Sequence, residues 1–151
     1  MISSISSFCF INSSRYIAVR DYLTVKVWDV AKNDKPVFSV TVQDALKSKL
    51  CDIFENDCIF DKFSISASKD SNTLLTGNYN NTFHTIDVND CSNTQFEVNY
   101  KKQTICKPMT SGKGSTIAKM DYTRKTLSSD FHPKANMFAV ASLNCFLTYT
   151  M

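Results

Sequence analysis

The run RDYLTVKVWDV, residues 20–30, decides the fold. Alternate residues of an extended strand point to opposite faces, so Val25 and Val27 share one face while Lys26 and Trp28 share the other. The strand closes with the dipeptide Trp28-Asp29 and comes soon after a second short apolar run. If this hairpin is one unit of a repeat, the same spacing should return later in the chain.

The spacing returns twice in degenerate form. TVKVWDV (24–30) aligns with TFHTIDV (82–88) and CFLTYTM (145–151), so that Ile86 and Tyr149 take the position of Trp28. A polar turn and a short apolar strand precede each copy, the strands being YIAV (16–19), TLLT (73–76) and MFAVA (137–141). Three strand–turn–strand units in register, one of them ending in Trp-Asp, indicate blades of a WD-repeat β-propeller.

The sequence therefore predicts an all-β chain: two complete blades and one incomplete blade of a WD-repeat propeller. The blades are expected at residues 2–42, 58–100 and 126–151, with fourth strands at 36–42 and 94–100 in the first two. The third blade stops after its third strand. Since a propeller closes by completing its last blade with a strand from elsewhere, we expect these to be the C-terminal blades of a larger ring.

Two insertions lengthen the repeats. In residues 43–57, Leu46, Leu50, Ile53 and Phe54 recur with the spacing of one helix face. This pattern predicts a short helix at the rim of the sheets, with a weak capping box at residues 41–44. The second insertion, residues 101–125, carries most of the basic excess of the chain and is expected to be a loop.

The repeat positions have structural roles. Trp28, Asp29 and Asp87 are interpreted as residues that build the blades, and we expect replacement of Trp28 by alanine to cost about 3–5 kcal/mol. His84, within a strand, and His132, in a turn before a proline, are also interpreted as structural.

Composition sets further bounds. The 151 residues are 43% hydrophobic and 21% charged, with a net charge of +3, which is typical of a globular protein. No apolar run is long enough to cross a bilayer. Six cysteines without a Cys-x-x-Cys pair predict reduced thiols and a cytoplasmic location, with the nucleus as a second possibility. No residue pattern predicts a catalytic site, a metal site or a cofactor.

Several segments together resemble one family, the B-family (55-kilodalton class) regulatory subunits of protein phosphatase 2A. The segment ENDCIFDKF (55–63) is the most specific of them, because generic WD-repeat blades do not carry it. The others are ISSIS (2–6), RDYLTVKVWDV (20–30), SKLC (48–51), TGNYNN (76–81) and HPKANMFAVA (132–141). Two positions depart from the family: Phe54 stands where it usually has tyrosine, and Phe131 where it usually has tryptophan.

The resemblance implies a non-catalytic subunit that binds the phosphatase scaffold and catalytic subunits and directs the holoenzyme to phosphoserine and phosphothreonine substrates. It also implies that Glu55, Asp57, Phe60 and Lys62 line the substrate-recruiting groove. The chemistry suits that role: the two carboxylates attract basic ligand residues, Phe60 offers apolar area, and Lys62 can pair with an acidic group.

Three alternatives remain open at this point. The chain could be a generic WD-repeat scaffold, in which residues 54–63 have no special role. It could be an inactive propeller fragment. It could also bind nucleic acid through the basic loop 101–125, although Tyr122 is the one aromatic residue there and a solvated loop is favoured.

Overall fold

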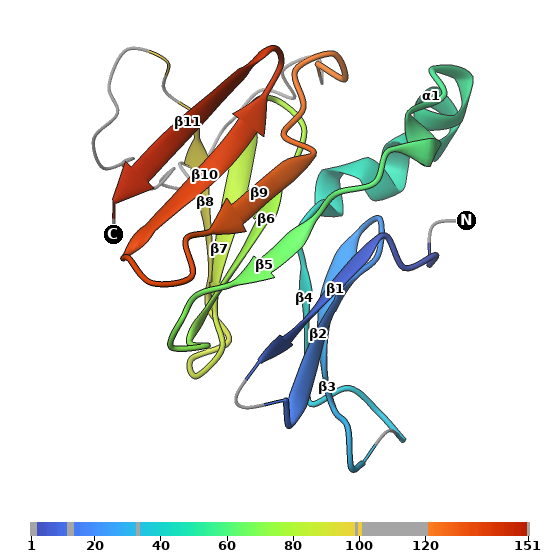
Figure 1. Cartoon of the computed structure of the whole chain (residues 1–151). Coiled ribbons are helices and arrows are strands. Elements are labelled where there is room, and N and C mark those ends of the chain that lie inside the picture. The colour runs from blue at the N-terminus through green and yellow to red at the C-terminus, as the bar shows by residue number, and fades with distance from the viewer. Residues whose placement is uncertain (1–2, 12–13, 33, 99, 101–120, 151) are drawn as a thin grey trace.

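The computed structural model describes residues 3–11, 14–32, 34–98, 100 and 121–150. Its strands form three antiparallel sheets that follow one another along the chain (Figure 1). The first sheet contains β1 (Ser7–Ile11), β2 (Tyr16–Arg20), β3 (Thr24–Asp29) and β4 (Phe38–Thr41). The second contains β5 (Ile65–Ala67), β6 (Thr73–Gly77), β7 (Thr82–Asp87) and β8 (Asn93–Glu97).

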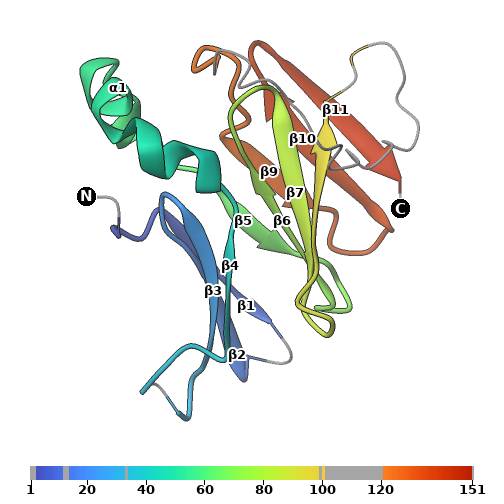
Figure 2. The ribbon, with the colours of Figure 1, turned by 180° about the vertical axis from the view of Figure 1, so that it is seen from behind.

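The third sheet contains β9 (Ser128–Phe131), β10 (Met137–Ser142) and β11 (Cys145–Thr150). In each sheet consecutive strands are neighbours, which is the meander of a propeller blade. The predicted fold is confirmed: two four-stranded blades and one of three strands, with a short helical insertion at one end of the sheets (Figure 2).

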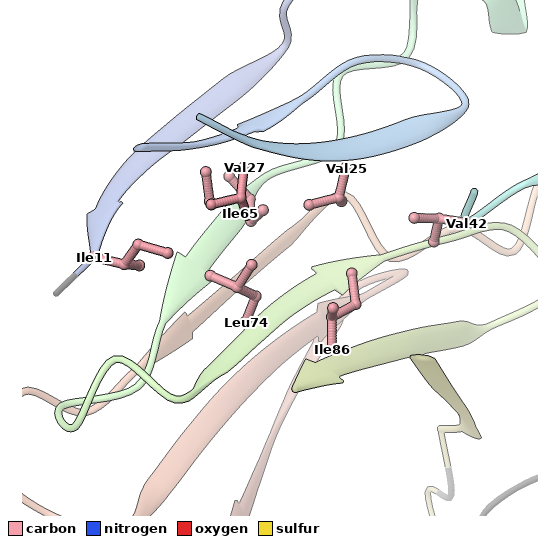
Figure 3. Packing of buried hydrophobic residues seen from close by; sticks show 8 residues of the cluster. Ile11, Val25, Val27, Val42, Ile65, Leu74 and Ile86 are labelled. Atoms are coloured by element: carbon pink, nitrogen blue, oxygen red, sulfur yellow. The ribbon is translucent and has the colours of Figure 1, made fainter. Parts of the chain in front are cut away.

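The first two blades pack face to face through aliphatic side chains. Ile11, Val25 and Val27 of the first blade meet Ile65, Leu74 and Ile86 of the second, and all six are at least 95% buried (Figure 3). The predicted alternation of side chains between the two faces of β3 is therefore confirmed, because Val25 and Val27 enter this core while Lys26 and Trp28 point away from it.

The second and third blades meet through aromatic side chains. Phe83 of β7 lies with its ring centroid 5.6 Å from the rings of both Phe138 and Tyr149. Leu75 and Val140 are fully buried beside them. The residue at the Trp28 position of each later blade, Ile86 or Tyr149, thus packs against the blade before it.

Trp28 itself differs from the prediction. It is only partly buried and belongs to none of the described core clusters. Its neighbour across the sheet is Ile17, and the face that they share is not covered by another blade within the described structure. The expected cost of 3–5 kcal/mol for its loss is therefore too large, since that range applies to a fully buried side chain.

The insertion after β4 folds as three short helical turns. A 3₁₀ turn, Asp44–Lys49, leads into α1 (Leu50–Glu55), and a second 3₁₀ turn spans Cys58–Phe60. The predicted apolar face is partly wrong: Leu46 and Ile53 are buried, but Phe54 is 60% exposed. The expected capping box is also absent, since Gln43 makes no side-chain cap bond to the turn that follows.

The repeat aspartates end their strands in the same way. Asp29 Oδ1 accepts a hydrogen bond of 2.8 Å from the backbone of Ala31, and Asp87 Oδ1 accepts one of 2.8 Å from that of Asn89. Each carboxylate therefore closes the turn after the third strand of its blade. Within the described residues, no helix is long and apolar enough to cross a membrane.

Candidate functional site

The four residues predicted to line a groove lie on one continuous segment at the rim. Glu55 ends α1, Asp57 follows it, Phe60 ends the second 3₁₀ turn, and Lys62 lies just beyond. All four side chains are exposed to solvent. We call residues 55–63 the rim segment.

The turn at the start of the rim segment requires a left-handed residue. Asp57 has φ of 57°, and its backbone NH donates to the Phe54 carbonyl at 3.1 Å, which closes the last turn of α1. Aspartate and asparagine tolerate this conformation better than most residues do. Asp57 thus has a conformational role in addition to its exposed charge.

Other residues of the same segment point inward. Cys58 is buried, Asp61 is mostly covered, and Phe63 is 1% exposed. The Phe63 ring lies 5.1 Å from that of Tyr79, and the guanidinium of Arg20 lies 5.4 Å from its centroid. Burial lowers the pKa of Arg20 to about 10. These contacts hold the segment on the first two blades.

A polar network forms around Asp61. Its Oδ2 accepts a hydrogen bond of 2.7 Å from the Tyr79 hydroxyl, and its Oδ1 lies 2.5 Å from Lys125 Nζ. The Tyr79 hydroxyl is also 2.8 Å from that of Tyr22, which belongs to the first blade. Burial, followed by these hydrogen bonds, raises the pKa of Tyr79 well above its ordinary value, so this hydroxyl stays protonated and can donate.

Lys125 reaches Asp61 from a strand-like segment that precedes the third blade. Backbone bonds fix that segment on the second blade: Asn81 NH donates to Arg124 O and Thr126 NH donates to Asn78 O, each at 2.9 Å. The approach is close enough that a Cβ on Gly77 would lie 1.8 Å from the Thr126 carbonyl oxygen. Glycine is therefore required at position 77.

A shallow pocket of about 160 Å³ opens beside the rim segment. Its walls come from the chain before β1, from the β2–β3 turn of the first blade and from the rim segment. The lining residues are Ser4, Ile5, Ser6, Tyr22, Ile59, Phe60, Asp61 and Lys62. The structure thus brings Phe60 and Lys62 together at a pocket, whereas Glu55 and Asp57 are not among its lining residues.

The surface offers charge and apolar area together. Glu55, Asp57 and Lys62 form no ion pair with any residue that the structure describes. Phe60 is 59% exposed, and Ile5 across the pocket is 60% exposed. Unpaired charges around exposed apolar side chains suit the binding of a peptide, because the charges select a partner and the apolar groups supply contact area.

The two histidines of the described residues are held in local hydrogen bonds. In the part of the chain that the structure describes, no group of three or more potential ligands could hold a metal ion. His84 is buried between two asparagines, and His132 Nδ1 accepts backbone bonds from Lys134 and Ala135 within its turn.

Most of the predicted basic loop 101–125 falls outside the described residues, which resume at 121. Its two described basic side chains are both paired: Arg124 lies 3.4 Å from Asp121, and Lys125 lies 2.5 Å from Asp61. The sequence had not indicated that Asp61, Tyr79 and Lys125 meet. The only available signal was that Asp61 lies within the segment typical of the family.

No family model matches the chain. Among curated proteins, one relative is the B beta isoform of the 55 kDa regulatory subunit of serine/threonine-protein phosphatase 2A from Carassius auratus, which is 41% identical over 95% of this chain. The chain spans 35% of that relative's length. The predicted resemblance to the 55-kilodalton regulatory subunits is thereby confirmed.

Solved structures agree on the fold. The crystal structure of the RRP9 WD40 repeats has a TM-score of 0.58, and a structure of U3-55K has a TM-score of 0.56. Each match covers 93% of this chain and 33% of the other, at 9% sequence identity. At that identity the likeness concerns the WD-repeat fold alone.

Proposed function

From its relation to the 55-kilodalton regulatory subunits of protein phosphatase 2A, we propose that this chain is a non-catalytic regulatory module of that phosphatase. It directs the enzyme to phosphoserine and phosphothreonine substrates, and the reacting groups and metal ions belong to the catalytic subunit. The observation that carries the proposal is the rim segment, the part most specific to the family, which presents four exposed side chains beside a pocket.

The chemistry of this surface defines the ligand. Phe60 and Ile5 line the same pocket of about 160 Å³ and are both more than half exposed, so this pocket suits an apolar anchor such as a leucine side chain. Glu55 and Asp57 lie outside the pocket and are free to attract arginine or lysine that flanks such a residue. The substrate elements proposed here are therefore basic segments that contain an apolar anchor, with Lys62 available for an acidic or phosphorylated neighbour.

The proposed partners are the phosphatase scaffold subunit, the catalytic subunit and phosphoprotein substrates. A cytoplasmic location, with nuclear presence as a second possibility, belongs to the same proposal. Because the chain corresponds to about a third of its relative, assembly must be tested directly.

A pull-down with purified scaffold and catalytic subunits provides that test, read beside a size-exclusion profile of the 151-residue chain. Stoichiometric capture of a monodisperse chain would support a regulatory role for these blades. Failure of capture from a well-folded sample would contradict it.

Substrate binding is measured separately, by fluorescence anisotropy. The probe is a short fluorescein-labelled peptide in which arginines and lysines surround one leucine. We expect saturable binding that weakens when Phe60 is replaced by serine. Binding insensitive to every change in the rim segment would favour a generic WD-repeat scaffold instead.

A further inference from the structure

The network around Asp61 connects parts of the chain that are far apart in sequence. Asp61 belongs to the rim segment, Tyr22 to the first blade, Tyr79 to the second, and Lys125 to the approach to the third. The polar atoms of these four side chains lie within hydrogen-bonding distance of one another along the network, next to the exposed residues Phe60 and Lys62. We propose that Asp61, Tyr79 and Lys125 form a lock that holds the rim segment in its binding conformation, and that they are positioning residues for the recruitment site.

Each donor in the lock can be assigned to one acceptor. Each tyrosine hydroxyl has one proton to donate. Two acceptors lie near the Tyr79 hydroxyl, Asp61 Oδ2 at 2.7 Å and the Cys58 carbonyl oxygen at 3.1 Å. The carboxylate is the stronger and nearer of the two, so the Tyr79 proton goes to Asp61, and the Tyr22 proton can go to the Tyr79 oxygen. The second carboxylate oxygen takes the Lys125 ammonium. Both oxygens of Asp61 thus have a donor, and the segment is fixed two residues before its end.

Burial makes this lock stronger than a surface ion pair. The side chains of Asp61 and Lys125 are 13% and 31% exposed, whereas the Asp44–Lys47 pair on the neighbouring 3₁₀ turn has exposures of 78% and 54%. Exposed pairs contribute little because water screens them. Removing one member of a mostly covered network leaves the other charge without its partner, so the segment is expected to open.

The alternation of the rim segment explains how the lock acts on binding. Asp61 faces inward between Phe60 and Lys62, which both face outward and line the pocket. Rotation of the backbone at Asp61 would displace both neighbours. The inference rests on the proposed function for its meaning, but the opening of the segment can be measured without any ligand.

Cys58 reports on that opening. Its side chain is in the same segment, is 7% exposed, and lies near the lock. In the 151-residue chain, the rate of Cys58 alkylation by iodoacetamide is followed by mass spectrometry of peptides. Cys51, which is exposed on α1, serves as the internal standard in each sample.

The variants are Tyr79→Phe and Lys125→Met. For both, the change in the thiol pKa alone predicts slower alkylation of Cys58, whereas opening of the rim segment predicts faster alkylation. Tyr79 and Lys125 each lower the pKa of the Cys58 thiol, while burial raises it, so their removal leaves less thiolate and slower alkylation. If the lock holds the segment closed, alkylation instead becomes faster, by about tenfold for the loss of one bond to a charged group. Asp61→Asn is less informative, because both effects would accelerate the reaction.

Two matched controls separate the lock from general damage. Tyr122→Phe removes a buried hydroxyl that has no hydrogen-bond partner among the described residues, and it should leave Cys58 at the wild-type rate. Lys125→Arg keeps the positive charge and should restore slow alkylation. Thermal unfolding of each variant confirms that the blades stay folded.

Binding of the fluorescein-labelled basic peptide is then compared in the same variants. The expected result is faster Cys58 alkylation with about tenfold weaker binding in Tyr79→Phe and Lys125→Met. Unchanged or slower alkylation would overturn the lock, and faster alkylation with unchanged affinity would overturn its role in positioning. If the wild-type chain binds no peptide while the alkylation results hold, the recruitment function fails and with it the positioning role, although the lock itself stands.

Discussion

His84 makes the stability of the chain depend on pH at the scale of one residue. Its Nδ1 lies 2.8 Å from Asn93 Oδ1 and its Nε2 lies 2.9 Å from Asn78 Nδ2, so a neutral ring that donates through Nδ1 satisfies both amides. Burial lowers the pKa of His84 from 6.5 to about 4, and the nearby Arg20 acts in the same direction. The hydrogen bond to Asn93 opposes this shift but does not overcome it.

The sign of the pH effect follows from the lowered pKa. Below pH 6.5 the unfolded chain binds a proton that the folded chain refuses until about pH 4, so stability is lost as the pH falls between these values. The full loss is about 3 kcal/mol. Urea unfolding of wild type and His84→Gln across this range should show a much flatter profile for the variant. His132→Gln, at the exposed histidine, is the control and should keep the wild-type slope; equal slopes for all three would contradict the assignment.

Asp57 combines a conformation with a charge, and two substitutions separate them. Asp57→Asn removes the charge but suits the left-handed φ of 57°, whereas Asp57→Lys reverses the charge and adds about 1–2 kcal/mol of backbone strain. We expect Asp57→Asn to weaken binding of the basic peptide several-fold while leaving the free energy of unfolding within about 0.5 kcal/mol of wild type. Full affinity in both variants would show that the Asp57 charge does not contact the ligand.

At the scale of the element, the third strand of each blade shows what a sequence pattern can predict. Strict alternation placed Val25 and Val27 on the opposite face from Trp28, because the period of a strand is two residues. Which face is more deeply buried depends on the neighbouring sheets. Ile86 and Tyr149, at the Trp28 position, are covered by a preceding blade, whereas Trp28 is not.

This difference predicts unequal costs at equivalent positions. Ile86→Ala should lower the free energy of unfolding by about 2–5 kcal/mol, because Ile86 is fully buried between the first two blades. Trp28→Ala should cost about 1–2 kcal/mol, since part of its ring is already in water. Chemical denaturation of both variants tests the order, and a larger loss for Trp28→Ala would mean that its face is covered in solution.

The helical insertion and the rim segment were predicted only in part from the sequence. Helical spacing identified Leu46 and Ile53 but added Phe54, because a short helix joined to 3₁₀ turns does not keep the period of a long one. The family-specific segment identified the exposed residues. Its anchor, the pairing of Asp61 with Lys125, joins positions 64 residues apart and left no periodic signal.

At the scale of the whole molecule, the first blade has an open apolar face. Phe8 and Phe10 on β1 are 58% and 56% exposed, and Ile17 and Trp28 on the next two strands lie in the same row as Phe10. In the other two blades the equivalent faces are buried in the cores between blades. A contiguous apolar face of this kind favours association with another chain.

We therefore expect the isolated 151-residue chain to self-associate, and expect Phe8→Ser combined with Phe10→Ser to shift it toward monomer. The midpoint of thermal unfolding, measured on dilute samples, should change little because these side chains bury little area within the chain. Phe60→Ser is the matched control: Phe60 is 59% exposed but lies on the rim segment, so its loss should leave association unchanged. Light scattering after size exclusion at several protein concentrations measures the shift. Equal reduction by Phe60→Ser would show that association depends on exposed aromatic area in general, while no reduction by the double variant would show that the open face of the first blade is not the contact.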